Sequence, residues 1–139
     1  MYFVLGVAHS VLFYVDIVLI AIILLMVGTQ VYWWAKTKTD KRIVENDDFA
    51  KGLHRGQIVD LRDEAKFTKE HILGARNMPL MQLKMYQDSL RKDMPVYLYD
   101  DSMQTALRAA NQLKKQGFTE VYVLKGGYSA WDGKKKVSK

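Results

Sequence analysis

The amino-terminal part of the chain is apolar at nearly every position. Residues 17–35 form a run of 19 residues without a formal charge. As a helix that rises ~1.5 Å per residue, this run would extend ~28 Å, close to the ~30 Å hydrocarbon core of a bilayer. Tyr32, Trp33 and Trp34 form an aromatic cluster of the kind found at headgroup level. The pattern predicts one transmembrane anchor within residues 1–35.

Two other interpretations of this segment fit the sequence less well. A cleaved signal peptide would begin with a basic region and would carry small residues in an A-x-A-like pattern after its apolar stretch. Neither feature is present. A core helix of a soluble domain would have a polar face, whereas this segment is hydrophobic on all sides. The membrane anchor is therefore the favoured interpretation.

After residue 45 the pattern changes to alternating strand-like and helical segments. Strands are predicted at residues 57–62, 96–100 and 120–125, and an extended segment at residues 75–79. Helical segments are predicted at residues 46–53, 63–72, 80–93 and 105–116. Strands that alternate with helices predict an α/β domain, with a mainly parallel sheet that helices cover on both faces. The chain then divides into an anchor (1–35), a basic juxtamembrane linker (36–45), this domain (46–132) and a solvated basic tail (133–139).

The charged residues are distributed unevenly between these parts. All 21 Lys and Arg residues lie after residue 35 with 14 of the 15 acidic residues, which gives that part a net charge of +7. Four basic residues follow the apolar run closely: Lys36, Lys38, Lys41 and Arg42. Because positive flanks stay in the cytoplasm, we expect the N-terminus outside the cell membrane and the domain in the cytoplasm. Contact of these four side chains with anionic lipid explains the charge more simply than nucleic-acid binding does.

The chain contains no cysteine. Within these 139 residues, that excludes disulfides, thiolate metal sites and a cysteine nucleophile. No cofactor and no metal ion are expected from the sequence as a whole.

Two stretches of the domain carry a family resemblance. Residues 58–80, IVDLRDEAKFTKEHILGARNMPL, resemble the first signature of the rhodanese family. Residues 113–131, LKKQGFTEVYVLKGGYSAW, are similar to the closing signature of that family. The chain as a whole resembles the membrane-anchored, single-domain rhodanese-like proteins of bacteria. The resemblance implies a rhodanese-like α/β fold after the transmembrane helix.

The resemblance also implies structural roles for seven residues. Asp60 and Arg62 match positions whose ion-pair and backbone contacts hold the loops, and His71 matches a packing and hydrogen-bonding position. Trp131 is expected to close the core, and Leu73 replaces a proline that is usual in the family. The glycines expected at tight turns or positive φ are Gly74, Gly126 and Gly127.

In active rhodaneses the catalytic cysteine lies in a six-residue loop after a strand. Backbone N–H groups of that loop stabilise the persulfide and bound oxyanions. Counted back from Ala109 and Ala110, the cysteine position is Asp100. The loop reads Asp100, Asp101, Ser102, Met103, Gln104 and Thr105, without the usual glycine and arginine. Because a carboxylate cannot hold sulfane sulfur as a persulfide, we expect this loop to be catalytically degenerate.

Three uses of the acidic loop are consistent with the sequence. Asp100, Asp101 and Ser102 would cap the following helix, as Asp and Ser often do. Alternatively, Asp100 would occupy the anion site of the loop, accept two or three backbone N–H bonds and have a lowered pKa. In the third interpretation, Asp100 and Asp101 would coordinate a cation.

Two classes of function follow from the sequence. The favoured class is a non-catalytic protein-interaction or scaffold module at the cytoplasmic membrane face, with a protein partner. The alternative is an enzyme, either a sulfurtransferase or carrier that works with a partner's cysteine, or a hydrolase built on the acidic loop. An assay of sulfur transfer from thiosulfate distinguishes the two classes.

Overall fold

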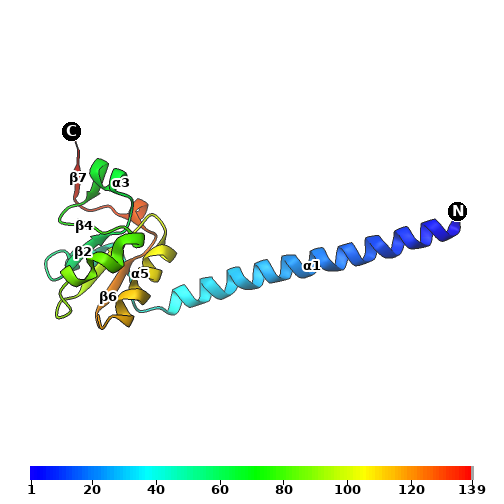
Figure 1. Cartoon of the computed structure of the whole chain (residues 1–139), viewed down its shortest axis with the longest axis horizontal. Helices are drawn as coiled ribbons and strands as arrows, with labels where there is room; N and C mark the ends of the chain where they lie inside the picture. Colours follow the sequence, from blue (N-terminus) through cyan, green and yellow to red (C-terminus); the bar gives the residue numbers. More distant parts are fainter. Residues whose placement is uncertain (139) are drawn as a thin grey trace. The chain divides into compact units, whose positions relative to one another are not determined.

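The computed structural model describes residues 1–138 and divides into two compact units, Met1–Asp40 and Lys41–Lys139 (Figure 1). Lys139, the last residue of the predicted tail 133–139, lies outside the described residues. The first unit is a single helix, α1 (Tyr2–Thr39), of 38 residues. Its side chains are exposed along the apolar stretch, and its length and composition make it a candidate membrane span.

Helix α1 continues beyond Ala35, where the predicted anchor ends. In this last part the hydroxyl groups of Thr37 and Thr39 donate to backbone carbonyls of the preceding turn. The Lys38 ammonium lies 3.8 Å from the centroid of the Trp34 ring. Basic side chains near the end of a helix also complement its dipole, so these contacts explain why the helix extends into the basic segment.

The second unit is built on a five-stranded parallel sheet with the strand order β1-β6-β5-β2-β4. Its strands are β1 (Ile43–Val44), β2 (Gln57–Asp60), β4 (Arg76–Asn77), β5 (Val96–Tyr99) and β6 (Val121–Leu124). Every pair of neighbours in this sheet is parallel. The predicted mainly parallel sheet is confirmed.

Helices pack on both faces of the sheet. They are α2 (Asn46–Gly52), α3 (Glu64–Lys69), α4 (Leu83–Tyr86) and α5 (Met103–Lys115), with 3-10 turns η1 (Leu80–Gln82), η2 (Gln87–Ser89) and η3 (Tyr128–Ala130). Alternate strand residues enter two separate cores. Those packed with α4 and α5 are Val59, Leu98 and Val123, and those packed with α2 are Ile58, Tyr99 and Leu124. This period of two follows from the pleat of a strand and explains why the strands are apolar on both sides.

The domain begins before residue 46, where the sequence placed its boundary. Ile43 and Val44, expected within the basic linker 36–45, form edge strand β1 and pair with β6. Lys125 donates its N–H to the Val44 carbonyl at 2.9 Å. Two residues are too short to produce a strand pattern in the sequence, so only the pairing with β6 reveals this element.

The segment 80–93 does not form the single helix that was predicted. It folds as η1, the four-residue α4 and η2. Its buried side chains are Leu83, Gln87 and Leu90, whereas Met81 and Met85 are largely exposed. The core therefore contacts this segment at a few points, and no continuous apolar stripe stabilises a longer helix.

The basic tail is also more ordered than predicted. Residues Lys135–Val137 form β7, which pairs antiparallel with β3 (Glu70–Ile72). The expected helical segment 63–72 consequently ends at Lys69, where its last residues become β3. The β7 side chains are all exposed, as expected of a charged tail, but the backbone is paired. A solvated composition gives no sign of this backbone pairing.

Candidate functional site

The loop between β5 and α5 lies at the carboxyl edge of the parallel sheet, where α/β folds commonly bind ligands. It contains only Asp100, Asp101 and Ser102, since α5 begins at Met103. Residues 103–105, which the sequence placed in a six-residue loop, form the first turn of that helix. Met103 and Gln104 are good helix formers, which favours this earlier start.

The backbone of this loop packs closely against the turn after β6. Tyr128 donates its N–H to the Asp100 carbonyl at 2.9 Å. Gly127 has a φ of +76°, and a Cβ at this position would lie 2.6 Å from the carbonyl oxygen of Asp101. Only glycine fits both the backbone angle and this close approach. Gly126 and Gly74 also adopt positive φ, at +77° and +88°.

The Asp100 carboxylate interacts with its own loop. It accepts a hydrogen bond from the Ser102 N–H at 2.9 Å, with a side chain that is half-buried. Burial raises the pKa of Asp100 more than this bond lowers it. The predicted anion site with two or three backbone donors and a lowered pKa is therefore wrong. A single donor is too little to offset the loss of hydration.

Asp101 and Ser102 do not act as the helix caps that the sequence suggested. Ser102 is the N-cap residue of α5, but no side-chain hydrogen bond caps the helix. Asp101 instead forms an exposed ion pair with Lys66 at 2.5 Å, which raises the pKa of Lys66. Within residues 1–138, no three His, Asp or Glu side chains converge as metal ligands would.

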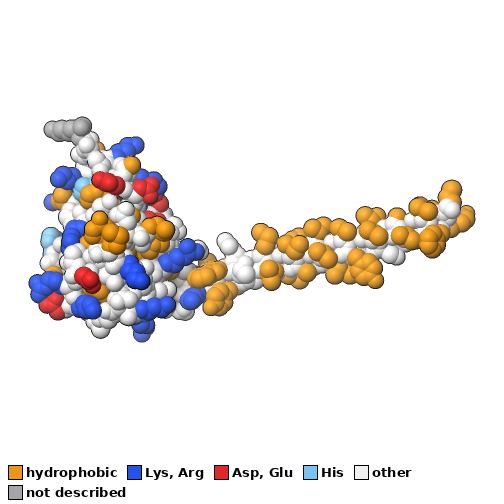
Figure 2. Space-filling view, in the orientation of Figure 1, with side chains coloured by type: hydrophobic (Ala, Val, Ile, Leu, Met, Phe, Trp, Pro, Cys, Tyr) orange, Lys and Arg blue, Asp and Glu red, His pale blue; other side chains and the backbone are white. Residues whose placement is uncertain are grey.

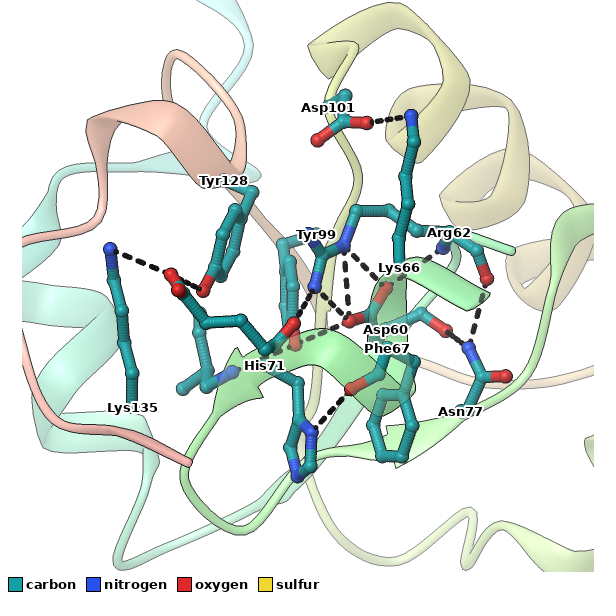
Figure 3. Close-up of polar contacts among 12 residues, drawn as sticks. Asp60, Arg62, Lys66, Phe67, His71, Asn77, Tyr99, Asp101, Tyr128 and Lys135 are labelled. Carbon is teal, nitrogen blue, oxygen red and sulfur yellow. Dashed lines mark hydrogen bonds and ion pairs between the residues drawn. The ribbon is translucent and has the colours of Figure 1, made fainter. Parts of the chain in front are cut away.

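A buried polar network lies next to the loop, at the ends of β2 and β5 (Figure 3). Asp60 is fully buried, and Arg62 donates to both of its carboxylate oxygens, with a shortest distance of 2.8 Å. The Tyr99 hydroxyl donates to Asp60 at 2.7 Å and accepts the Ile72 N–H at 3.1 Å. Asn77 donates to the backbone carbonyls of Asp60 and Arg62. This network joins β2, β3, β4 and β5.

The same network extends toward the tail strand β7. Arg62 donates to the Glu70 carbonyl at 2.6 Å, and its guanidinium lies 3.8 Å from the centroid of the Tyr128 ring. The Tyr128 hydroxyl donates to the Glu70 carboxylate at 2.5 Å, and Lys135 pairs with that carboxylate at 3.3 Å. The Tyr128 bond and then Lys135 lower the pKa of Glu70, while burial raises the pKa of Tyr128. These contacts position the strand ends and loops around residue 100.

His71 and Trp131 take part in packing. The His71 ring stacks on Phe67 with 3.8 Å between ring centroids, and its Nδ1 lies 2.8 Å from the Phe67 carbonyl oxygen. Trp131 is buried against Phe49 in the core on the α2 face. Leu73, at the position where the family usually has proline, is exposed.

A groove of about 510 Å³ lies at the same carboxyl edge, beside the ends of β2 and β4. We call it the carboxyl-edge groove, and its lining residues are Asp63, Glu64, Phe67, Thr68, Asn77, Pro79, Gln82 and Tyr86. The lining does not include residues 100–105. Met81 and Met85, on the segment that forms one wall, are 93% and 74% exposed. The groove is thus lined by two carboxylates, two aromatic rings and polar side chains, and the two exposed methionines lie on the segment of its wall without lining it.

Sequence reasoning did not identify this groove or the roles of Tyr99, Glu70 and Tyr128. Tyr99 and Tyr128 lie directly beside positions already singled out, Asp100 and Gly127. The hydroxyl of a tyrosine at the end of a buried strand needs a hydrogen-bond partner, so the sequence could have predicted a polar contact for Tyr99. The groove had no such signal, because its walls come from segments that are separate in the sequence.

Comparison with known proteins identifies the fold. Residues 45–134 match the family described as the rhodanese-like domain. The chain is 42% identical over 123 residues to the Bacillus subtilis uncharacterized protein YqhL, covering 88% of this chain and 94% of that protein. It is 35% identical over 74 residues to the thiosulfate sulfurtransferase GlpE of Coxiella burnetii, covering 53% of this chain and 69% of that protein.

Among solved structures, the chain is similar to the rhodanese-like domain of the Anabaena Alr3790 protein. The two share 28% sequence identity with a TM-score of 0.64, over 71% of this chain and 81% of that chain. The family match covers more than half of the chain and coincides with the unit that contains the parallel sheet. The chain therefore belongs to the rhodanese-like domain family.

Proposed function

We propose that this protein is a membrane-anchored, catalytically inactive rhodanese-like domain that acts as a protein-interaction module at the cytoplasmic face of the membrane. In this proposal Asp100 occupies the position of the family's catalytic cysteine. The observation that carries the interaction role is the carboxyl-edge groove, together with the exposed Met81 and Met85, which lie on the segment 79–86 that forms one of its walls.

Loss of sulfurtransferase chemistry follows from the residues at the loop. Sulfur transfer through a persulfide requires a thiolate, and the 139 residues contain no cysteine. The Asp100 carboxylate already binds the Ser102 N–H, and the nearby cation Lys66 is paired with Asp101. An incoming thiosulfate would therefore meet the carboxylates of Asp100 and Asp101. The Lys66 ammonium, which could attract it, is already paired with Asp101.

The anchor and its topology rest on the sequence of α1. An exposed apolar helix of this length is stable in a bilayer and would be a liability in water. The aromatic residues Tyr32–Trp34 and the basic residues after them mark the cytoplasmic end. Protease added to intact cells should leave the domain uncut, whereas cleavage of the domain from outside would reverse the proposed topology.

The carboxyl-edge groove fits a protein partner with apolar and basic side chains. Methionine is flexible and polarisable, so exposed methionines suit a surface that adapts to another protein. Asp63 and Glu64 in the same lining favour a positively charged residue of the partner.

The interaction role is tested by crosslinking the full chain in native membranes. The double variant Met81→Gln and Met85→Gln should lose the crosslinked partner, because it removes apolar contact while preserving length. Leu73→Gln provides the matched control, since Leu73 is an exposed apolar residue outside the segment 79–86 that forms a wall of the groove. Equal loss of the partner in both variants would exclude the groove as the binding site.

The alternative function is sulfur transfer that uses a cysteine of a partner protein. It is favoured by the similarity to proteins that are themselves thiosulfate sulfurtransferases. Purified protein should not transfer sulfur from thiosulfate to cyanide above a heat-inactivated control. Activity that appears only when the crosslinked partner is added, and disappears when the partner's thiols are alkylated, would support the alternative.

A further inference from the structure

A second groove, of about 230 Å³, lies at the opposite edge of the sheet, where β6 begins. We call it the basic groove. Its lining includes Lys41 and Arg42 before β1, Lys114 in the last turn of α5, and the acidic residue Glu120. Phe118 forms part of its wall, and the Lys92 ammonium lies 5.7 Å from the centroid of that ring. Figure 2 shows Lys and Arg side chains on the surface of this domain.

Three lysines of this region form no ion pair with the described residues. Within residues 1–138, Lys41, Lys92 and Lys114 have no carboxylate partner within ion-pair distance. Elsewhere, Arg91 and Lys125 lie 2.6 and 2.5 Å from carboxylate oxygens. Lys41 and Lys114 line the groove, and Lys92 lies against its Phe118 wall, so the local positive charge favours binding of an anion.

Complementation of the α5 dipole explains only part of this arrangement. Lys114 in the last turn favourably faces the partial negative charge at the helix end. Lys41 precedes β1, and Lys92 precedes β5, so neither belongs to that helix. Three separate segments therefore bring positive charge to the groove or to its Phe118 wall, and a local effect on α5 does not account for it.

The chain connection restricts the identity of the anion. Helix α1 ends at Thr39, two residues before Lys41. At no more than ~3.6 Å per residue, the backbone of Lys41 lies within about 7 Å of the helix end. The helix end itself follows Trp34 by five residues, or about 7.5 Å. If α1 spans the bilayer with its aromatic residues at headgroup level, Lys41 lies within about 15 Å of the headgroups.

From this geometry we propose that the basic groove binds the phosphate headgroups of anionic phospholipids in the leaflet that holds the anchor. This inference rests on the membrane anchoring proposed above. Lys41, Lys92 and Lys114 are the residues that provide the attraction. Each basic residue near an anionic leaflet contributes on the order of fivefold in binding, so three act together as an orienting contact.

Lipid binding at the basic groove would also determine which face of the domain meets a partner. In a parallel sheet the amino and carboxyl ends of the strands lie at opposite edges. The basic groove is lined by Val121 and Tyr122 at the start of β6, and the carboxyl-edge groove by Asn77 at the end of β4. Headgroup contact at the first would leave the second directed toward the cytoplasm.

The absence of cysteine makes a direct test possible. The full chain with Thr119→Cys carries a fluorescent label in the basic groove, and the chain with Thr68→Cys carries it in the carboxyl-edge groove. Each is reconstituted in vesicles of phosphatidylcholine alone or mixed with phosphatidylglycerol, both with quencher-labelled headgroups. We expect quenching of the Thr119 label to rise in the anionic vesicles and to fall again at high salt, with little change for the Thr68 label.

Charge substitutions identify the residues responsible. Combined Lys41→Gln, Lys92→Gln and Lys114→Gln changes should weaken the docking equilibrium by on the order of a hundredfold. The matched control replaces Lys69, Lys84 and Lys134 by Gln, which removes the same charge at lysines that neither line the groove nor lie over its Phe118 ring. Quenching that is independent of lipid charge, or equally reduced by both triple variants, would overturn the inference.

Flotation of the vesicles separates the proposed anchor from the proposed lipid contact. Protein that fails to co-float with the vesicles contradicts both proposals. Protein that co-floats, but whose quenching does not change with lipid charge, contradicts the lipid contact alone.

Discussion

At the residue scale, the domain contains two Arg–Asp pairs with the same spacing in different environments. Arg62 and Asp60 are buried, whereas Arg91 and Asp93 are exposed. Replacing Arg62 by Ala leaves the Asp60 carboxylate buried without its cation, which typically costs about 3–5 kcal/mol. Arg91→Ala breaks a solvent-screened pair and should have little effect. Urea unfolding of both variants measures this difference, and similar losses would mean that burial does not determine the importance of the pair.

The charge of Asp100 gives a second residue-scale prediction. Its folded-state pKa lies above the unfolded value of about 3.9, so the ionised carboxylate disfavours the folded state at neutral pH. That penalty is relieved as pH falls through the folded pKa. Asn preserves an oxygen for the Ser102 N–H without a charge, so Asp100→Asn should raise the free energy of unfolding at neutral pH by about 0.5 kcal/mol.

The advantage of Asp100→Asn should disappear below about pH 4, where the wild-type carboxyl is protonated in both states. Unfolding curves at neutral and acid pH test this dependence. A variant that is less stable than wild type at neutral pH, with a deficit that shrinks in acid, would restore the anion-site interpretation of the loop.

At the element scale, β7 connects the tail to the network around Arg62. Leu73 donates its N–H to the Lys134 carbonyl at 3.2 Å, whereas the neighbouring Ile72 N–H is bound by the Tyr99 hydroxyl. Removal of residues 133–139 should therefore expose the Leu73 amide to hydrogen exchange and leave the Ile72 amide protected. Unchanged protection of Leu73 would show that β3 does not depend on its pairing with β7.

At the scale of the whole molecule, the boundary between the two units determines which fragment folds. Residues 41–139 include β1 and the residue before it. The carbonyl of Arg42 accepts the Val123 N–H at 2.8 Å, and the carbonyl of Val44 accepts the Lys125 N–H at 2.9 Å. This fragment should be soluble, monomeric and folded without lipid. A fragment of residues 46–139 loses these bonds and should be less stable by about 1–3 kcal/mol.

Circular dichroism and urea unfolding compare the two fragments, with sedimentation as a measure of association. Aggregation of residues 41–139 without lipid would contradict the division into an apolar helix and an independent domain. Equal stability of the two fragments would show that edge strand β1 contributes nothing to the sheet.

The sequence alone was sufficient for the features that depend on long, regular patterns. The uncharged run before Lys36 identified α1, and the alternation of apolar strands and amphipathic helices identified the parallel sheet. Two signature stretches indicated the family that the comparisons then established. Each of these features extends over many residues, so a single atypical residue does not change the predicted element.

Only the tertiary structure decided the short elements and the chemistry at the strand ends. β1 and β7 exist through backbone pairing with distant strands, which side-chain patterns of two or three residues do not encode. The pKa of Asp100 depends on burial and on a single N–H donor, and neither follows from its position in the sequence. The two grooves likewise combine segments that are separate along the chain. Burial, pairing and surface shape are properties of the packed domain, so they become defined only when its elements meet.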